Sequence, residues 1–153
     1  WTRAEPQALF AEAQLILSNR LKDVELVDET MELEAIQCSP SKLVQVLINL
    51  IGNAIYAAGK GSGEPQVRLV LKQDSNHTTF EIYDNGAGID EKVKDTLFDP
   101  FVTSKPVGEG TGMGLAICYS IIVDDHKGII SGENEAVGAK FSVKLPNNYK
   151  GNN

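Results

Sequence analysis

Three stretches of the chain carry apolar residues at the three- and four-residue spacing of an amphipathic helix. They are expected at residues 6–21, at residues 41–58 and from residue 111 to about residue 125. Ser39 is placed to cap the second helix, and Pro40 fits its first turn. Each predicted helix therefore has one apolar face to bury against another layer of the fold.

Six shorter segments alternate apolar and polar residues, as half-buried strands do. They come in adjacent pairs, at residues 24–27 and 33–36, 67–71 and 79–84, and 128–132 and 139–145. We expect the first pair to form a β-hairpin or an edge pair. Since parallel strands need a helix between them, this order favours a mixed, mostly antiparallel sheet and disfavours a dinucleotide-binding Rossmann unit. The predicted fold is an α+β two-layer sandwich with about three helices on one face.

Composition narrows the classes of function. The net charge is -7, and without a basic stripe the chain is not expected to bind nucleic acid or to contact a membrane directly. Cys38 and Cys118 are too few for a disulfide framework and are expected to be buried free thiols in a reducing, cytoplasmic compartment. No apolar run approaches the eighteen or so residues of a membrane span. The length suits a single domain, residues 1–153, with a core at about 5–146.

Two glycine clusters, at residues 84–89 and 108–115, bracket about thirty residues with little apolar pattern. A connection of this length suggests a functional lid, expected at about residues 86–113. The second cluster precedes a predicted helix, whose first backbone N–H groups can bind an anion, and a nucleotide is the ligand to test. The region does not match a P-loop, because no Gly-Lys-Ser/Thr follows the glycines. Taken alone, either cluster is equally compatible with simple turns.

Polar side chains elsewhere support a nucleotide. Gln45, Asn49 and Asn53 are four residues apart and form a row along the second predicted helix. Asparagine is unfavourable inside a helix, so the row needs an explanation. These side chains are exposed to solvent, form a structural hydrogen bond, or supply hard oxygen ligands for Mg²⁺. Asp84 ends a predicted strand, where it either starts a turn or accepts a hydrogen bond from an exocyclic amine.

The predicted lid contains its own candidates. Phe98 and Phe101 flank Pro100 and are expected to anchor a small apolar cluster whose packing changes when a lid closes. Lys105 is the only cation in the second half of the predicted lid. It is either a solvated surface residue or a point charge for a terminal phosphate.

Four motifs together resemble the Asn box, first glycine box, Phe box and second glycine box of sensor histidine kinases. They lie in the family's order, at residues 45–54, 84–89, 98–101 and 110–115, and residues 138–146 resemble the family's closing strand. Any one motif could arise by chance, whereas four in order could hardly do so. The resemblance implies the ATP-binding fold shared with type II topoisomerases, a heat-shock chaperone and mismatch-repair ATPases.

The resemblance also implies roles for individual residues. Asn53 would coordinate Mg²⁺ with Asn49 beside it, Asp84 would receive the adenine amine, and Lys105 would contact the phosphates. Asn49, Asn53 and Lys105 are thus the candidate catalytic residues. The implied nucleotide-binding set is Asn49, Asn53, Tyr56, Asp84, Gly86, Gly88, Ile89, Phe98, Phe101, Thr103, Lys105, Gly110, Thr111, Gly112, Met113, Gly114 and Leu115.

Two positions depart from the family pattern in the turn after the second asparagine. Many members carry a Lys and then an aromatic residue there, but this chain has Tyr56 and Ala57. A phosphate contact from that turn is therefore not expected, and Lys105 is the candidate to replace it.

The implied activity is transfer of the γ-phosphoryl group of ATP to a histidine on a separate helical dimerisation domain, with a response regulator downstream. That domain is expected outside this chain, because His77 is predicted in an exposed turn and His126 in a structural position. The alternatives are a nucleotide-binding pseudokinase and an ATP-hydrolysing switch. Hydrolysing relatives carry a glutamate where this chain has Asn49, and the Phe box favours histidine kinases over serine-phosphorylating relatives. The isolated domain is expected to be a monomer.

Overall fold

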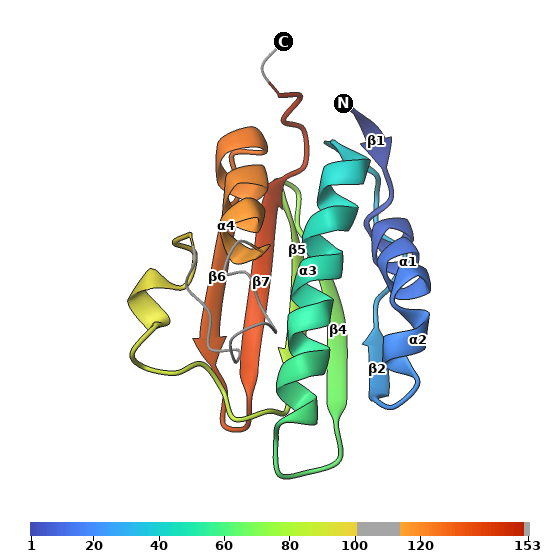
Figure 1. Cartoon of the computed structure of the whole chain (residues 1–153). Helices are drawn as coiled ribbons and strands as arrows, with labels where there is room; N and C mark the ends of the chain where they lie inside the picture. Colours follow the sequence, from blue (N-terminus) through green and yellow to red (C-terminus); the bar gives the residue numbers. More distant parts are fainter. Residues whose placement is uncertain (101–113, 152–153) are drawn as a thin grey trace.

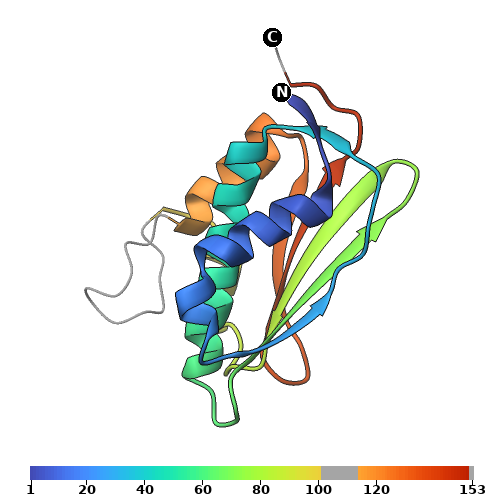
Figure 2. The same cartoon turned by 90° about the vertical axis from the view of Figure 1, so that its right-hand side faces the viewer.

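The computed structural model describes residues 1–100 and 114–151. In chain order its elements are β1 Thr2–Ala4, α1 Pro6–Ile16, α2 Ser18–Leu21, β2 Glu25–Glu29, β3 Ile36–Cys38, α3 Pro40–Gly59, β4 Gln66–Gln73, β5 His77–Asp84, a 3₁₀ turn Lys94–Thr96, α4 Gly114–Tyr119, a π-helix Ser120–Asp125, β6 Ile129–Asn134 and β7 Ala139–Pro146. Helices cover one face of the main sheet and leave the other bare (Figures 1 and 2). The predicted two-layer α+β fold is confirmed.

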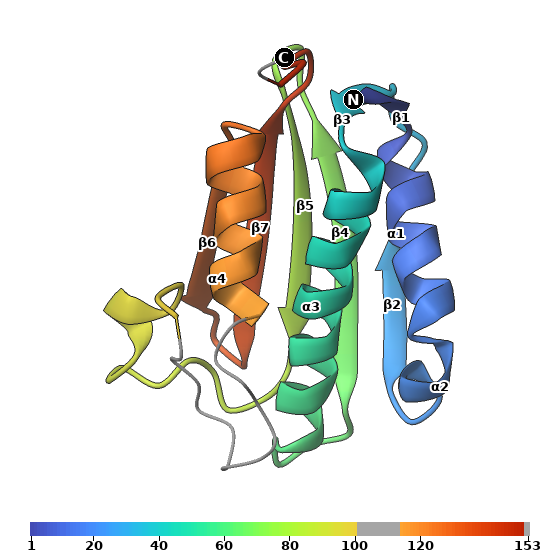
Figure 3. The same ribbon diagram turned by 45° about the horizontal axis from the view of Figure 1, so that its top comes forward.

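The main sheet has the strand order β2-β4-β5-β7-β6. The pairs β4–β5, β5–β7 and β7–β6 are antiparallel, and β2 pairs parallel with β4. The sheet is therefore mixed and mostly antiparallel, as the order of the predicted strands indicated. Figure 3 shows α4 over β6 and β7, α3 over β5 and β4, and α1 beside β2.

The predicted pairing of residues 24–27 with residues 33–36 is wrong. β2 lies beside β4, and α3 supplies the long crossover that a parallel pair requires. β3 pairs instead with β1, a strand that the pattern did not reveal, and Thr2 lies opposite Cys38 in this small sheet. Alternation located β2, but β3 begins only at the last residue of the second predicted segment, and each strand pairs with a distant part of the chain.

The helix boundaries also differ from the pattern. The helix expected at residues 6–21 breaks at Leu17, which is buried and leaves helical geometry with φ -92° and ψ 10°. The third helix continues from α4 into a π-helix, and residues 111–113 lie outside the described part of the chain. Ser39 does not cap α3 with its side chain. Its backbone N–H donates to His126 Nε2 at 3.1 Å instead.

The core lies between α3 and the helix-facing side of the sheet. Leu50 and Ile51 on α3 are fully buried, and Phe80 on β5 meets Phe10 of α1 edge to face, with ring centroids 5.2 Å apart. Contrary to the expectation from the sequence, α3 is long and apolar enough to count as a candidate membrane span. Half of that stretch is buried inside the domain, so its apolar face is explained by the core.

Candidate nucleotide-binding site

Asp84 lies at the end of β5, on the strand face that is turned toward the helices. Only 7% of its surface is exposed. Oδ1 accepts a hydrogen bond from Gly86 N at 2.9 Å, and the carboxylate also accepts one from the backbone of Ala139. Burial raises the pKa of Asp84, and these two hydrogen bonds offset part of the rise. A buried, well-oriented carboxylate at a strand end is suited to receive a hydrogen-bond donor from a ligand.

The loop after Asp84 requires glycine at position 86, because its backbone passes close to α3 there. A Cβ at position 86 would collide with the carbonyl oxygen of Ala57. Gly88 adopts φ +89°, a left-handed conformation that favours glycine. The end of β5 and the C-terminal end of α3 thus meet at one end of the molecule (Figure 1), and a simple exposed turn does not describe this loop.

Asn49, the middle residue of the asparagine row, lies on the side of α3 that faces α4. Gln45 is exposed, whereas Asn49 and Asn53 are half-buried. Asn49 hydrogen-bonds the Cys118 thiol, and its Oδ1 lies 3.6 Å from where a Cβ on Gly114 would be. Asn49 therefore sits where α3 meets the first turn of α4, next to the second glycine box.

Tyr56 occupies the position at which many family members carry Lys. Its side chain is half-buried, and the ammonium of Lys60, one turn later on α3, lies 5.5 Å from the centre of its ring. This geometry suits a cation–π contact. The departure therefore places an aromatic ring beneath a neighbouring cation.

The remaining site candidates fall into two groups. Ile89, Phe98 and Leu115 are half-buried and pack against the core, and the rings of Phe98 and Tyr119 have centroids 6.0 Å apart. The anchoring role predicted for Phe98 agrees with this packing. Phe101, Thr103, Lys105, Gly110, Thr111, Gly112 and Met113 lie outside the described residues.

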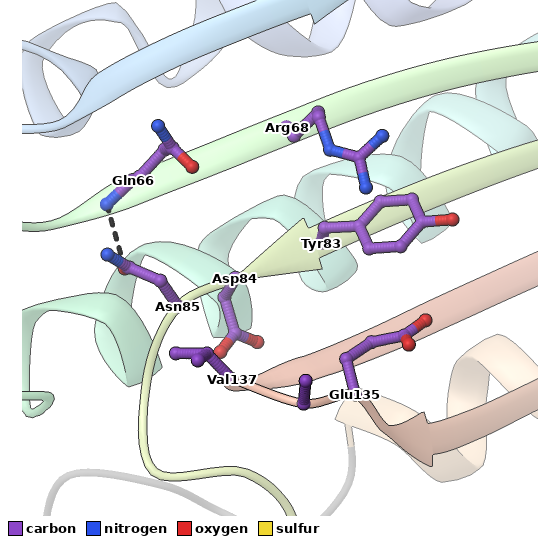
Figure 4. Close-up of a pocket in the computed structure, with 8 residues that line it drawn as sticks. Gln66, Arg68, Tyr83, Asp84, Asn85, Glu135 and Val137 are labelled. Carbon is purple, nitrogen blue, oxygen red and sulfur yellow. Dashed lines mark hydrogen bonds between the residues drawn. The ribbon is translucent and has the colours of Figure 1, made fainter.

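The motifs missed three residues that shape the loop. Asn85 accepts a hydrogen bond from Gln66 N at 2.9 Å and donates to the Glu64 carbonyl oxygen at 2.7 Å (Figure 4). Gly138 adopts φ +79°, and a Cβ there would collide with the Asp84 carbonyl oxygen. Asn134 bonds both backbone groups of Ile89. Asn85 and Gly138 lie inside recognised motifs but were assigned no role, whereas no local signal indicated Asn134.

A cavity of about 460 Å³ opens on the bare face of the sheet, beside the end of β5. Arg68 stacks on Tyr83 there, with the guanidinium carbon 3.8 Å from the ring centre (Figure 4). Asp84 and Asn85, at the end of β5, are also among the residues that line this cavity. The nucleotide candidates on α3 face the opposite side of the sheet.

The two histidines differ from each other in their surroundings. His126 is 2% exposed, and its ring bonds the Ile121 carbonyl oxygen through Nδ1 at 2.8 Å and the Ser39 N–H through Nε2. The predicted structural role of His126 is confirmed. The prediction of His77 in an exposed turn is wrong. His77 is the first residue of β5 and is half-buried. The turn before it is organised by Asp74, whose Oδ1 accepts from Asn76 N and His77 N.

Comparison with known proteins identifies the family. The family described as "Histidine kinase-, DNA gyrase B-, and HSP90-like ATPase" matches this chain over residues 38–149. This chain belongs to that family. The match begins at β3 and includes both asparagines, Asp84 and the glycines of both boxes, so the domain is of the ATP-binding type.

Curated relatives within this ATPase family are sensor kinases. The chain is 34% identical over 92% of its length to the C4-dicarboxylate transport sensor protein DctS of Rhodobacter capsulatus, of which it covers 21%. It is 35% identical over 88% of its length to sporulation kinase E of Bacillus subtilis, of which it covers 17%. The chain therefore spans about a fifth of the length of these relatives.

Solved structures agree in fold. The catalytic domain of histidine kinase ThkA, in a nucleotide-free form, superposes with a TM-score of 0.84 at 28% identity, covering 97% of this chain and 100% of that one. ThkA in complex with the response regulator TrrA gives a TM-score of 0.78 at 27% identity, covering 95% of this chain and 41% of that one. The ATPase domain described here corresponds to a catalytic domain in these structures.

Proposed function

We propose that this domain binds Mg-ATP and transfers the γ-phosphoryl group to a histidine on a separate helical dimerisation domain of a longer parent protein. A response regulator is the expected downstream partner, because ThkA, with a similar catalytic domain, forms such a complex. The isolated domain is expected to act as a monomer in the cytoplasm.

The buried carboxylate of Asp84 is the observation that carries this proposal. An exocyclic amine donates hydrogen bonds, and a carboxylate already oriented by Gly86 and Ala139 can accept one without reorganising. Burying this carboxylate costs stability in the free domain, which is typical of a group kept for binding rather than for folding. Adenine carries this amine, whereas guanine presents an oxygen at the same position of its ring.

The donors on α3 fit a magnesium ion that keeps most of its ligands as water and phosphate oxygens. Asn53 and Asn49 offer neutral oxygens one turn apart, and no group of three or more metal-binding His, Cys, Asp or Glu side chains occurs among the described residues. Asn53 would hold Mg²⁺, with Asn49 beside it. When bound, Mg²⁺ neutralises charge that develops on the transferred phosphoryl group.

Transfer is favoured over hydrolysis by the chemistry of residue 49. A hydrolysing switch needs a general base to activate water, and the carboxamide of Asn49 cannot accept a proton at neutral pH. Lys105 is proposed as a phosphate contact, by similarity to the family.

The phosphoryl acceptor is proposed to lie outside this chain. His126 is buried with both ring nitrogens engaged. His77 and Asp84 occupy opposite ends of the eight-residue strand β5, about 23 Å apart at strand geometry. Neither histidine of the chain is therefore suited to receive the phosphoryl group.

The test combines this domain, γ-labelled ATP and the separately produced helical domain of the same parent. We expect label to appear on the helical domain and to be lost with Asn53→Ala. Binding of ATP without transfer would indicate a nucleotide-binding pseudokinase. Tyr56, which stands where many family members carry Lys, would agree with that outcome. Turnover of ATP by this domain alone, abolished by Asn49→Ala, would instead indicate a hydrolysing switch.

A further inference from the structure

The far end of the loop at residues 84–89 is held by a side chain from another part of the sheet. Asn134, the last residue of β6, accepts a hydrogen bond from Ile89 N through Oδ1 at 2.6 Å. Its Nδ2 donates to the Ile89 carbonyl oxygen at 3.2 Å. The carboxamide thus pairs with both backbone groups of Ile89, as a neighbouring strand would. Ile89 is tied to the sheet although it belongs to no helix or strand.

Gly88 and Asn134 lie so close that the glycine is required. A Cβ at position 88 would lie 2.8 Å from Asn134 Oδ1, closer than side-chain carbons approach in real structures. The left-handed φ of +89° at the same residue turns the chain toward Asn134. The glycine that the sequence assigns to base approach therefore also accommodates the side chain that holds the loop.

The near end of the loop contacts the same β6–β7 turn. The Ala139 backbone donates to the Asp84 carboxylate, and Gly138 lies against the Asp84 carbonyl oxygen. Figure 1 shows the end of β5 and the β6–β7 turn at one end of the molecule. Residues 134–139 thus fix both ends of the loop, Asp84 and Ile89, while Gly86 packs on α3 between them.

We propose that Asn134 is a positioning residue for nucleotide recognition, acting through Ile89 to hold residues 86–89 at a fixed distance from the base-binding carboxylate of Asp84. This inference rests on the proposed ATP-binding function. Without Asn134 the loop has more conformations in the free protein, and binding must then order it, which lowers affinity. Because the loop faces the base, ATP and ADP should be affected alike.

The experiment compares Asn134→Ala, Asn134→Asp and the control Asn148→Ala with the wild-type domain. Asn148 is exposed and follows β7, far along the chain from the loop. Calorimetric titration measures the affinities for ATP, ADP and GTP, and hydrogen exchange measures protection of the Ile89 amide without nucleotide. We expect Asn134→Ala to weaken ATP and ADP by the same factor, about three- to tenfold, with faster exchange at Ile89. The preference for ATP over GTP should fall, which a general loss of stability would not cause.

The aspartate variant separates the two hydrogen bonds. It keeps an oxygen to accept from Ile89 N and loses the donor, so the Ile89 amide should stay protected while affinity falls about twofold. If Asn134→Ala does not fold, this variant carries the test. Wild-type ATP affinity in either folded variant, or equal weakening in Asn148→Ala, overturns the proposal. A wild-type domain that does not bind ATP refutes the proposed function instead, and exchange at Ile89 still shows whether Asn134 holds the loop.

Discussion

The buried thiol of Cys118 on α4 hydrogen-bonds the side chain of Asn49 on α3. The sulfur also lies 3.9 Å from the Val46 carbonyl oxygen, one turn before Asn49. Cys118 is fully buried and Asn49 is half-buried, so the thiol side of the contact is shielded from water. The helix that follows the second glycine box is therefore joined to the asparagine row by a polar contact within an apolar interface.

Both cysteines should be unreactive while the domain is folded. Burial raises the pKa of Cys118 to about 12 and that of Cys38 to about 11. At pH 8 the Cys118 thiolate would then be on the order of one in ten thousand molecules. We expect no labelling by a maleimide within minutes at pH 8, and labelling of both thiols after unfolding in urea. Rapid labelling of one thiol in the folded domain would contradict the burial of that residue.

Asp84→Asn should separate binding from stability. Removing the carboxylate leaves an amide that can donate where the ligand donates, so we expect ATP affinity to fall by at least tenfold. Calorimetric titration checks this, with Asp23→Asn as an exposed control. Unchanged ATP affinity in Asp84→Asn would contradict the assignment of the base-binding carboxylate.

The same variant has a predicted pH dependence. Burial raises the folded-state pKa of Asp84 above its ordinary value of 3.8, so the folded protein holds this proton more tightly than the unfolded chain does. The ionised group therefore destabilises the fold, by an amount that grows as the pH rises from about 3.8 through the folded pKa. We expect Asp84→Asn to melt at the same temperature as the wild type or higher at pH 7, with the difference shrinking toward pH 4.

Sequence pattern predicted the helical layer and the hairpin pairs β4–β5 and β6–β7, because the strands of each pair follow one another through a short turn, but it did not predict that β5 and β7 are neighbours. It failed at β2, whose partner β4 lies across α3, and at β3, which it placed at residues 33–36 and which pairs with β1 at the start of the chain. At the site, motifs located Asp84 and the asparagine row. They missed Asn134 and gave Gly138 no role of its own, because both roles depend on the approach of two loops that are distant in sequence.

Asn53→Ala should remove the magnesium dependence of ATP binding. The wild-type domain is expected to bind ATP more tightly with Mg²⁺ than with a chelator, because Asn53 is proposed to supply one of the few protein ligands to the ion. In the variant the two affinities should agree within about twofold, while affinity in the chelator stays at the wild-type value. Asn19→Ala, an exposed substitution on α2, should keep the full magnesium effect. A variant that retains this effect would remove Asn53 from the metal site.

Gly138→Ala and Gly59→Ala should change stability in opposite directions. Gly138 has φ +79°, and an added Cβ would collide with the Asp84 carbonyl oxygen, so we expect a loss of about 1–3 kcal/mol or more in the free energy of unfolding. Gly59 ends α3 with nothing within 4 Å of an added Cβ, and alanine there should add up to about 1 kcal/mol. Urea denaturation measures both. Equal stability of the two variants would contradict the close contact at Gly138.

His126 should make the domain less stable in mild acid. Burial lowers the folded-state pKa of His126 below its ordinary value of 6.5, so the unfolded chain binds the proton more readily. The groups around the ring are Asp125 and Lys42, which form an ion pair 2.9 Å long, and the indole of Trp1, 4.5 Å away between ring centroids. The stabilisation from neutral His126 is complete above pH 6.5 and is lost as the pH falls from there toward the folded pKa. Protonation would also turn the acceptor of the Ser39 N–H into a donor.

We expect His126→Gln to be less stable than the wild type at pH 7.5, with a difference that narrows by pH 5, as thermal denaturation across this range can measure. His77→Gln is the matched control, and a His126 variant with the wild-type slope of stability against pH would show that another group causes the acid sensitivity.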